Sequence, residues 1–405
     1  MAPALLARLS IAAGPALLVA GCQTAAPAHS ESSRNPPGCI LAFPGAEGAG
    51  ACSAGGRGGK TLWVTNLDDD GPGSLRAAVD ADGPRIVRFK VAGTIRLASD
   101  LIIRNARITI DGRGGPGQGI AIADHGLDVK ADDVVIRYIR SRLGDRGRGQ
   151  GDAITLSEGR RIILDHVSAS WSVDETLSVS ARYDATPGIH DVTVQWSIIS
   201  ESLRKAGHLK GEHGYGSLIR GGRGSKFSFH HNVWAFHVQR MPRPGNYEPK
   251  TSDPEGATFE FRSNVFYDWG GTASGYNADT ESVARYAFVD NCYMTGPDTR
   301  GRFIFREENP HARSWFSGNT LDGKLPRDQR DLVTGLWNPL SSPPEIAAVR
   351  SDPAPGGCAR TLADAGASAP RDSVDRRVIA AIRSRSGQII DSQDDIGGWP
   401  DLTGP

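Results

Sequence analysis

The sequence predicts an all-β protein whose chain winds into a right-handed, single-stranded parallel β-helix with short helical caps. The prediction depends on a repeated unit of β-rich runs, a high glycine content and asparagine at one position of successive units. Of the 405 residues, 50 are glycine, well above the usual share of about 7 per cent and without the every-third period of collagen. Glycine among runs rich in Val, Ile and Thr indicates many short strands joined by tight turns.

The repeated unit decides the fold class. Its equivalent position falls at residues 139, 167, 197, 232, 264, 291 and 319. These intervals lie within the range of about 20 to 50 residues that marks solenoids and propellers. Each unit has no room for a helix of ordinary length, which excludes helical solenoids and doubly wound α/β folds. A propeller blade needs about 40 residues and a tryptophan-aspartate signature, so a parallel β-helix is the better interpretation.

Four later units carry asparagine at this position: Asn232, Asn264, Asn291 and Asn319. Asparagine tolerates left-handed backbone conformations, and its amide can bond to the copies in the turns above and below. We therefore expect an asparagine stack. Alternate residues of the strands form the core, and the outward residues form a long shallow face suited to a polymer.

Both ends of the solenoid carry helix signals. Ser74 is the expected N-cap of a short helix over 73–79, and Asp372 or Ser373 opens an amphipathic helix that ends at Gly387. The apolar residues of the second helix are Val374, Val378, Ala381 and Ile382. We expect these helices to cover the open ends, as a solenoid requires.

The first residues predict export. Arg8 precedes an apolar stretch too short to span a membrane, which ends in Val19-Ala20-Gly21-Cys22. This ending resembles the lipobox of bacterial lipoproteins, in which the cysteine receives the lipid; the alternative is an ordinary signal peptide cut near residue 25 or 28. We predict a lipoprotein-type signal at 1–22, a flexible tether at 23–38 and a β-helix domain at 39–405, with a C-terminal cap from about residue 359.

The composition excludes several classes. With 39% hydrophobic and 23% charged residues, the chain is neither a disordered polyampholyte nor a multi-span membrane protein. A formal net charge of zero argues against a nucleic-acid binder. We expect a monomer that is either secreted or held in the cell envelope, at the outer membrane or in the periplasm, through a lipid on Cys22.

Cysteine usage agrees with export. Without Cys22, four cysteines remain, and an even number in an oxidising compartment suggests two disulfides. Three pairings are possible, of which the simplest joins neighbours in sequence. That pairing is Cys39–Cys52 and Cys292–Cys358.

Acidic residues on neighbouring units indicate a cation site. Asp152 begins one strand, and Asp174 and Glu175 begin the next. Stacked units bring such residues to about 4.8 Å from one another across adjacent strands, so they could serve as oxygen ligands for a hard cation such as Ca²⁺. Asp165-His166 is better explained as a structural turn.

A basic segment lies in the longest gap of the repeat, where solenoids insert functional loops. It is followed by Arg240-Met241-Pro242-Arg243, in which prolines stiffen the backbone that carries two guanidiniums. Because a guanidinium pairs with carboxylate in a bidentate manner, the expected partner is an acidic polysaccharide. The segment contains Arg204, Lys205, His208, Lys210, His213, Arg220, Arg223 and Lys226.

The ordered set of motifs resembles the pectate lyases of polysaccharide lyase family 1, especially the bacterial members of the trisaccharide-releasing type. The resemblance spans nearly the whole mature chain. It is carried by AFPGAEG at 42–48, NL at 66–67, GPGSLR at 71–76, IRY at 136–138, GDAI at 151–154, DH at 165–166, VTVQWSII at 192–199, HLKG at 208–211, RMPR at 240–243 and GGWP at 397–400.

The resemblance implies cleavage of α-1,4-linked galacturonate (pectate) by β-elimination with Ca²⁺. Cations that bridge the uronate carboxylate stabilise the charge that develops when the C5 proton leaves. Arg240 matches the base of the family, and Lys210 matches its substrate-binding lysine, with Lys205 as second candidate. Arg243 would hold a substrate carboxylate, and His208 is a further candidate for substrate binding.

Three positions depart from the family pattern: Gln150, Ser178 and Gly245 stand where two acids and an arginine are usual. Glu175 or Asp145 would compensate in the ion site. Two other functions remain open at this point. One is a galacturonan hydrolase that uses Asp152, Asp165 and Asp174 as converging carboxylates, and the other is a polyuronate-binding solenoid without catalysis.

Overall fold

The computed structural model describes residue 1 and residues 35–147, 151–181 and 188–404. The predicted signal at 1–22, Cys22, most of the predicted tether and Gln150 lie outside the described residues. Residues 33–405 form one compact unit, which is the subject of the following description. Within the described ranges, no helix has both the length and the apolar character that a membrane crossing requires.

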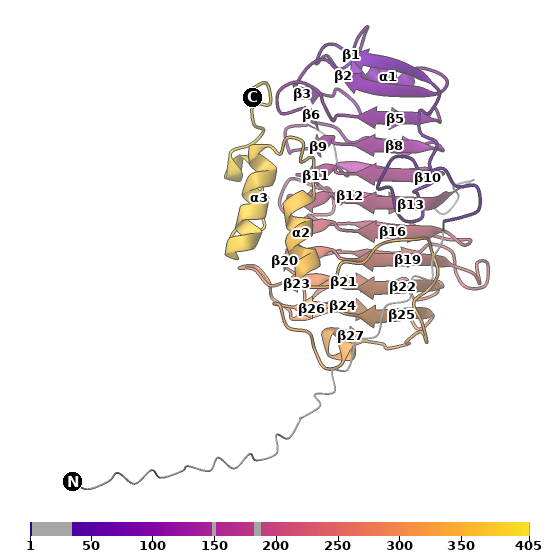
Figure 1. The fold of residues 1–405 in the computed structure, drawn as a ribbon, viewed down its shortest axis with the longest axis vertical. Coiled ribbons are helices and arrows are strands. Elements are labelled where there is room, and N and C mark those ends of the chain that lie inside the picture. Colours follow the sequence, from indigo (N-terminus) through magenta and orange to yellow (C-terminus); the bar gives the residue numbers. More distant parts are fainter. Residues whose placement is uncertain (2–34, 148–150, 182–187, 405) are drawn as a thin grey trace. The chain divides into compact units, whose positions relative to one another are not determined.

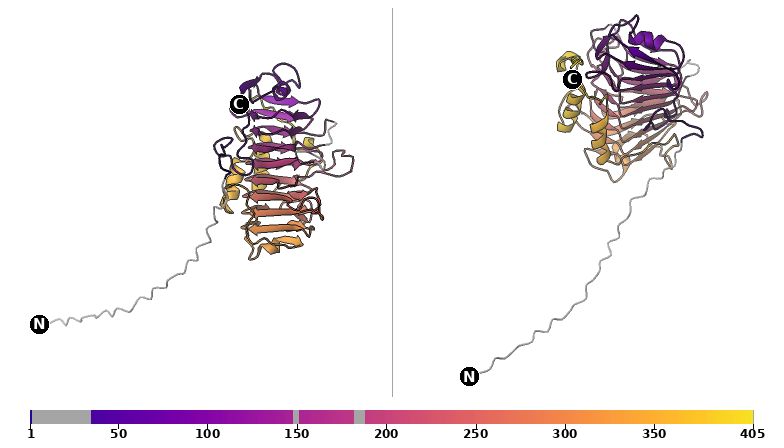
Figure 2. Two further views of the ribbon diagram at one scale, coloured as in Figure 1. Left: turned by 90° about the vertical axis from the view of Figure 1, so that its right-hand side faces the viewer. Right: turned by 45° about the horizontal axis from the view of Figure 1, so that its top comes forward.

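The unit is a parallel β-helix, as predicted, with strands stacked as successive rungs (Figures 1 and 2). Its first face is a row of parallel strands with one strand per turn. In order these are β1 (Lys60–Val64), β2 (Arg85–Phe89), β5 (Ile108–Asp111), β8 (Val134–Arg137), β10 (Ile154–Asp165), β13 (Ile189–Gln195), β16 (Lys226–His230), β19 (Ala257–Arg262), β22 (Ala284–Val289) and β25 (Ala312–Ser317).

The second face is a nine-stranded sheet of short parallel strands. They are β3 (Gly93–Arg96), β6 (Ile120–Ala123), β9 (Arg140–Arg142), β11 (Ser168–Ser170), β14 (Ile198–Ser200), β17 (Val233–His237), β20 (Val265–Trp269), β23 (Cys292–Met294) and β26 (Thr320–Leu321). All three residues in each of β9, β11 and β14 are buried.

The third face positions the candidate site. The long strand β10 contributes to the first face and to this one, with a register shift between Leu156 and Glu158. The other strands of this face are β4 (Leu101–Ile103), β7 (Leu127–Lys130), β12 (Leu177–Ser180), β15 (Leu218–Gly221) and β18 (Arg243–Asn246), followed by the three-stranded sheet of β21 (Ala273–Asn277), β24 (Phe303–Glu307) and β27 (Val333–Gly335).

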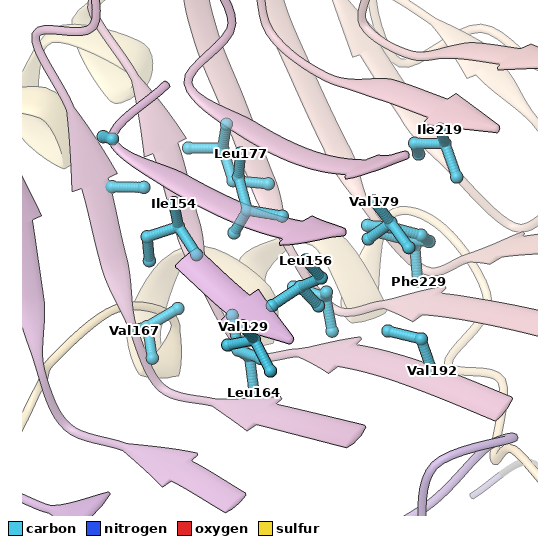
Figure 3. Close-up of a cluster of buried hydrophobic side chains, with 14 of the residues drawn as sticks. Val129, Ile154, Leu156, Leu164, Val167, Leu177, Val179, Val192, Ile219 and Phe229 are labelled. Carbon is cyan, nitrogen blue, oxygen red and sulfur yellow. The ribbon is translucent and has the colours of Figure 1, made fainter. Parts of the chain in front are cut away.

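Apolar side chains of the three faces fill the interior (Figure 3). Val129, Leu156, Val179 and Ile219 occupy paired register positions on four successive turns and are fully buried. The residues beside them in sequence point to the outer surface because side chains alternate along a strand. This alternation gives the third face its polar outer surface.

The asparagine stack is confirmed. The backbone N–H of Asn232 donates to Asn264 Oδ1 at 2.8 Å, and the backbone N–H of Asn264 donates to Asn291 Oδ1 at 3.0 Å. The expected left-handed backbone lies one residue earlier, at His231 (φ 55°) and Ser263 (φ 51°). The left-handed residue turns the chain, and the following asparagine points inward.

Both predicted helices are present with the expected N-caps, but the second ends earlier than predicted. Ser74 Oγ accepts the Ala77 N–H at the start of α1 (Leu75–Asp80), as predicted. Asp372 caps α3 (Ser373–Ser384), but this helix ends before Gly387 because Arg385 adopts the left-handed conformation and donates its N–H to the last turn.

The C-terminal helices do not cover an open end of the solenoid, contrary to the sequence prediction. α2 (Gly356–Asp364) and α3 pack along the second face (Figure 1), where Leu362 and Val378 join a cluster that includes Val233 and Val265. Their apolar stripes are buried by strands rather than by the last turn. Short 3₁₀ helices occur at Gln329–Leu332 and Gln393–Ile396.

Both disulfides join the expected neighbours in sequence. Cys39 is bonded to Cys52, and Cys292 is bonded to Cys358. The second bond fixes α2 to β23, which helps to hold the C-terminal segment on the second face.

Candidate active site

The candidate site lies where the strands of the third face begin on successive turns. Asp152 precedes the start of β10, Glu175 precedes β12 and Arg240 precedes β18. Parallel bridges join Glu175 to Tyr215 and Tyr215 to Gln239. Solenoid stacking therefore brings together residues that are far apart in the sequence.

Three carboxylates meet at one end of this row. Oxygen atoms of Asp152, Asp174 and Glu175 lie within 4.8 Å of one another, as the sequence predicted. The backbone N–H of Glu175 donates to Asp152 Oδ1 at 3.1 Å. Burial, reinforced by the charge of Asp174, raises the pKa of Asp152 to about 7. A cluster of carboxylate oxygens has the chemistry that a hard cation such as Ca²⁺ requires.

Arg240 reaches back to this cluster. Its guanidinium forms an ion pair with the buried Glu175 carboxylate, and it lies over the Tyr215 ring, 4.1 Å from the ring centre. Burial raises the pKa of Tyr215, so the phenol is neutral at neutral pH. The aromatic ring attracts the positive charge of the guanidinium and so stabilises its position.

Two histidines face Asp174 from the loop between β14 and β15. His208 Nε2 and His213 Nε2 lie 3.6 and 3.3 Å from the carboxylate oxygens, and the two rings stack with centres 3.9 Å apart. Burial and the neighbouring His213 lower the pKa of His208. His208, a sequence candidate for substrate binding, thus contacts a candidate metal ligand instead of an open surface.

The two lysine candidates lie on the same loop. Lys205 Nζ is 3.6 Å from Glu212 Oε1, with both side chains exposed. The backbone N–H of Lys210 donates to His208 Nδ1 at 3.1 Å, and its side chain is exposed. Within the described ranges, neither ammonium forms an ion pair with the three carboxylates.

Arg243 follows the site on β18 and shares an acid with a second arginine. Arg243 Nη2 lies 3.0 Å from Asp279 Oδ1, and Arg220 donates to both oxygens of the same carboxylate. Burial and the charge of Arg220 lower the pKa of Arg243. In the sequence, Arg220 was recognised only as a member of the basic segment, and no signal pointed to Asp279. The contact between Arg220, Arg243 and Asp279 arises from the stacking of separate turns, which a local motif does not reveal.

The third departure, Gly245, has a structural explanation. Arg220 pairs in register with Gly245, and a Cβ atom at position 245 would lie 2.0 Å from Asp279 Oδ2. Asp279 therefore occupies the space that a side chain would need. Arg220 supplies a guanidinium beside the position where the family pattern has its arginine.

Asp165 does not join the acid cluster. It ends β10 on the first face, where its buried carboxylate accepts hydrogen bonds from Arg137 Nε and Gln195 Nε2, both at 2.7 Å, and contacts His166 Nδ1 at 2.9 Å. These contacts agree with the interpretation of Asp165-His166 as a structural turn. The three converging carboxylates that a hydrolase would draw from Asp152, Asp165 and Asp174 are therefore not brought together.

Comparison with known sequences gives one consistent result. No family model matches the chain. A probable pectate lyase C of Aspergillus terreus is 36% identical over 377 residues, which cover 90% of this chain and 83% of that protein. A probable pectate lyase C of Aspergillus fumigatus has the same identity and coverage, and the tomato (Solanum lycopersicum) probable pectate lyase P56 is 28% identical over 249 residues, covering 55% of this chain and 56% of that protein.

Solved structures share the fold. A pectate lyase bound to a hexasaccharide gives a TM-score of 0.59 at 15% identity, covering 83% of this chain and all of that one. The pectate lyase Bsp165PelA from Bacillus sp. N165, in complex with trigalacturonate, gives 0.55 at 15% identity, covering 79% and 98%. These likenesses establish a common β-helix.

Proposed function

The chain belongs to the pectate lyase family, and from that premise we propose that it cleaves α-1,4-galacturonan by β-elimination with Arg240 as the base. It is a polysaccharide lyase that acts on pectate. The observation that carries the proposal is the position of Arg240. Its guanidinium forms an ion pair with Glu175 of the carboxylate cluster, and its charge helps to lower the pKa of a second arginine, Arg243.

The carboxylates Asp152, Asp174 and Glu175 would hold Ca²⁺. Their oxygens lie within 4.8 Å of one another, and Ca²⁺ prefers carboxylate oxygen. When bound, Ca²⁺ would supply positive charge next to the uronate carboxylate. Glu175 takes part in the set only when it is released from Arg240, because its carboxylate contacts that guanidinium in the structure.

Binding of the substrate and transfer of the proton are assigned to side chains of the protein. Arg243 and Arg220, oriented by Asp279, would bind and orient substrate carboxylates. Arg240 would act as the base in its neutral form, after it has been released from Glu175 and has lost its own proton, a state that neighbouring positive charges favour. It would then take the C5 proton, a C4–C5 double bond would form, and the C4–O electron pair would leave with the glycosidic oxygen, which takes a proton from water. Lys210 is the residue expected to bind a substrate carboxylate from the exposed loop.

The proposal includes export and a monomeric state. Both disulfides support export because such bonds persist in oxidising compartments. The lipid anchor is a separate part of the proposal. Mass spectrometry of the mature N-terminus would detect a lipid on Cys22, and a Cys22→Ser variant should leave the membrane fraction if the anchor exists.

The decisive experiment follows ultraviolet absorbance while the protein acts on polygalacturonate, with Ca²⁺ or with a chelator. We expect absorbance from the unsaturated product only with Ca²⁺, and we expect its loss in Arg240→Ala but not in Arg313→Ala, an exposed control on β25. Activity that survives chelation would contradict the ion site. New reducing ends without absorbance would indicate hydrolysis, and binding without either signal would indicate a non-catalytic protein.

A further inference from the structure

A row of outward side chains continues beyond Arg243 on the next two turns. Tyr276 on β21 donates its backbone N–H to Pro242 O at 3.1 Å, which places it beside the start of β18. Tyr276 pairs in register with Arg306 on β24. Both neighbouring guanidiniums, those of Arg243 and Arg306, lie 5.3 Å from the centre of the Tyr276 ring.

This Arg–Tyr–Arg row is open to solvent at its far end. The Arg306 side chain is 38% exposed, and its Nε lies 3.1 Å from the exposed Glu308. Arg300 and Arg302, just before β24, are also exposed. In the described part of the chain neither takes part in an ion pair.

The solenoid itself does not require these side chains. Inward residues make the core, and an outward arginine on a short strand would ordinarily be solvated or paired at the surface with little effect on stability. Here the tyrosine ring holds two guanidiniums at fixed positions. Rigid guanidiniums bind carboxylates in a bidentate manner, and an aromatic ring offers an apolar surface to a sugar.

We propose that Tyr276 and Arg306 form an additional uronate-binding subsite that extends the candidate active site beyond Arg243. The proposal rests on the proposed function, since the occupant is the same acidic polysaccharide. The subsite is continuous with the candidate active site, because Arg240, Arg243, Tyr276 and Arg306 lie on three successive turns of one face.

The spacing indicates which substrates would use the subsite. Neighbouring strands lie about 4.8 Å apart, so Arg243 and Arg306, two turns apart, are separated by about 10 Å along the solenoid axis. A polyuronate carries a carboxylate on every sugar and can meet both guanidiniums when it lies along this axis. A short oligomer bound at Arg240 and Arg243 would not reach Arg306.

The test compares Arg306→Ala and Tyr276→Ala with Arg313→Ala, which removes an exposed arginine from the first face. Lyase kinetics are measured on trigalacturonate and on long polygalacturonate. We expect KM for the polymer to rise about tenfold in both variants, as for loss of a charge-assisted contact. In Arg306→Ala, kcat and trimer kinetics should stay near wild type, whereas Tyr276→Ala should also weaken trimer binding, because its ring contacts Arg243. Equal KM values for the polymer in the Arg306→Ala and Arg313→Ala variants would contradict the proposed subsite.

A binding assay separates this inference from the proposed activity. Calorimetry with polygalacturonate is repeated in an Arg240→Ala background, in which no turnover is expected. Weaker binding after Arg306→Ala supports the subsite even if the wild-type protein has no lyase activity. Unchanged binding, with an active wild type, overturns the subsite and leaves the lyase assignment intact.

Discussion

The guanidinium of Arg240 forms an ion pair with the carboxylate of Glu175, although the first is the candidate base and the second is a candidate metal ligand. The same Glu175 donates its backbone N–H to Asp152, so the base and the acid cluster are directly connected. A cation that takes Glu175 as a ligand must compete with Arg240. This contact would couple metal binding to release of the candidate base.

Removing the competing guanidinium should tighten Ca²⁺ binding. We expect the Kd of Arg240→Gln for Ca²⁺, measured by calorimetry without substrate, to fall about tenfold, because a nearby positive charge opposes a second cation. Arg313→Gln serves as the control and should match wild type. An unchanged or higher Kd in Arg240→Gln would show that Glu175 is not a ligand.

Ca²⁺ binding should depend on pH through Asp152. Its pKa of about 7 means that a proton competes with the cation below this pH. We expect Ca²⁺ affinity to rise as pH increases from 6 to 8, with proton release detected by calorimetry in buffers of different ionisation enthalpy. Asp152→Asn should weaken binding and lose the proton release; release that persists would assign it to another group.

A side chain at position 245 should destabilise the protein. Its Cβ would lie 2.0 Å from Asp279 Oδ2, in space already filled by the contact with Arg220 and Arg243. We expect Gly245→Ala to lower the free energy of unfolding by about 1–3 kcal/mol, as overpacking does. Gly356→Ala, where nothing lies within 4 Å, is the matched control; equal denaturation midpoints would contradict the steric argument.

Glu307 should make the folded protein less stable as pH rises. Burial raises its pKa from 4.5 to about 8, so between these values the folded state retains a proton that the unfolded state has lost. The contribution of Glu307 to the free energy of unfolding is fully present below about pH 4.5 and is lost as the pH rises to about 8. Glu307→Gln should weaken this fall in denaturant titrations, while Glu308→Gln, at an exposed position, should retain it.

The asparagine stack should contribute strongly to stability. Asn264 Nδ2 donates to Phe229 O, and its Oδ1 accepts the Asn232 N–H, so truncation leaves buried polar groups without partners. We expect Asn264→Ala to lower the free energy of unfolding by about 2–5 kcal/mol. Asn338→Ala, at a partly exposed position, should cost much less, and similar losses would contradict a special role for the stack.

The strands, the asparagine stack and the disulfide pairing could be predicted from the sequence, whereas the position and the end of α3 could not. The strand repeat and the asparagines are local, periodic signals, and the four cysteines paired between sequence neighbours. The position of α3 was wrong because an amphipathic stripe specifies burial but not the surface that buries it. The predicted end of that helix at Gly387 was wrong because Arg385, which precedes this glycine, already adopts the left-handed conformation at the C-cap.

The sequence alone determined that the chain is a β-helix with acids at 152, 174 and 175 and arginines at 240 and 243. Motif spacing is enough for this, because each turn repeats a local pattern. Only the tertiary structure decided that Arg240 contacts Glu175, that Asp279 joins Arg220 to Arg243, and that Asp165 stays apart from the acid cluster. These contacts depend on which turns stack and how their strands are registered, which is set by packing between distant segments.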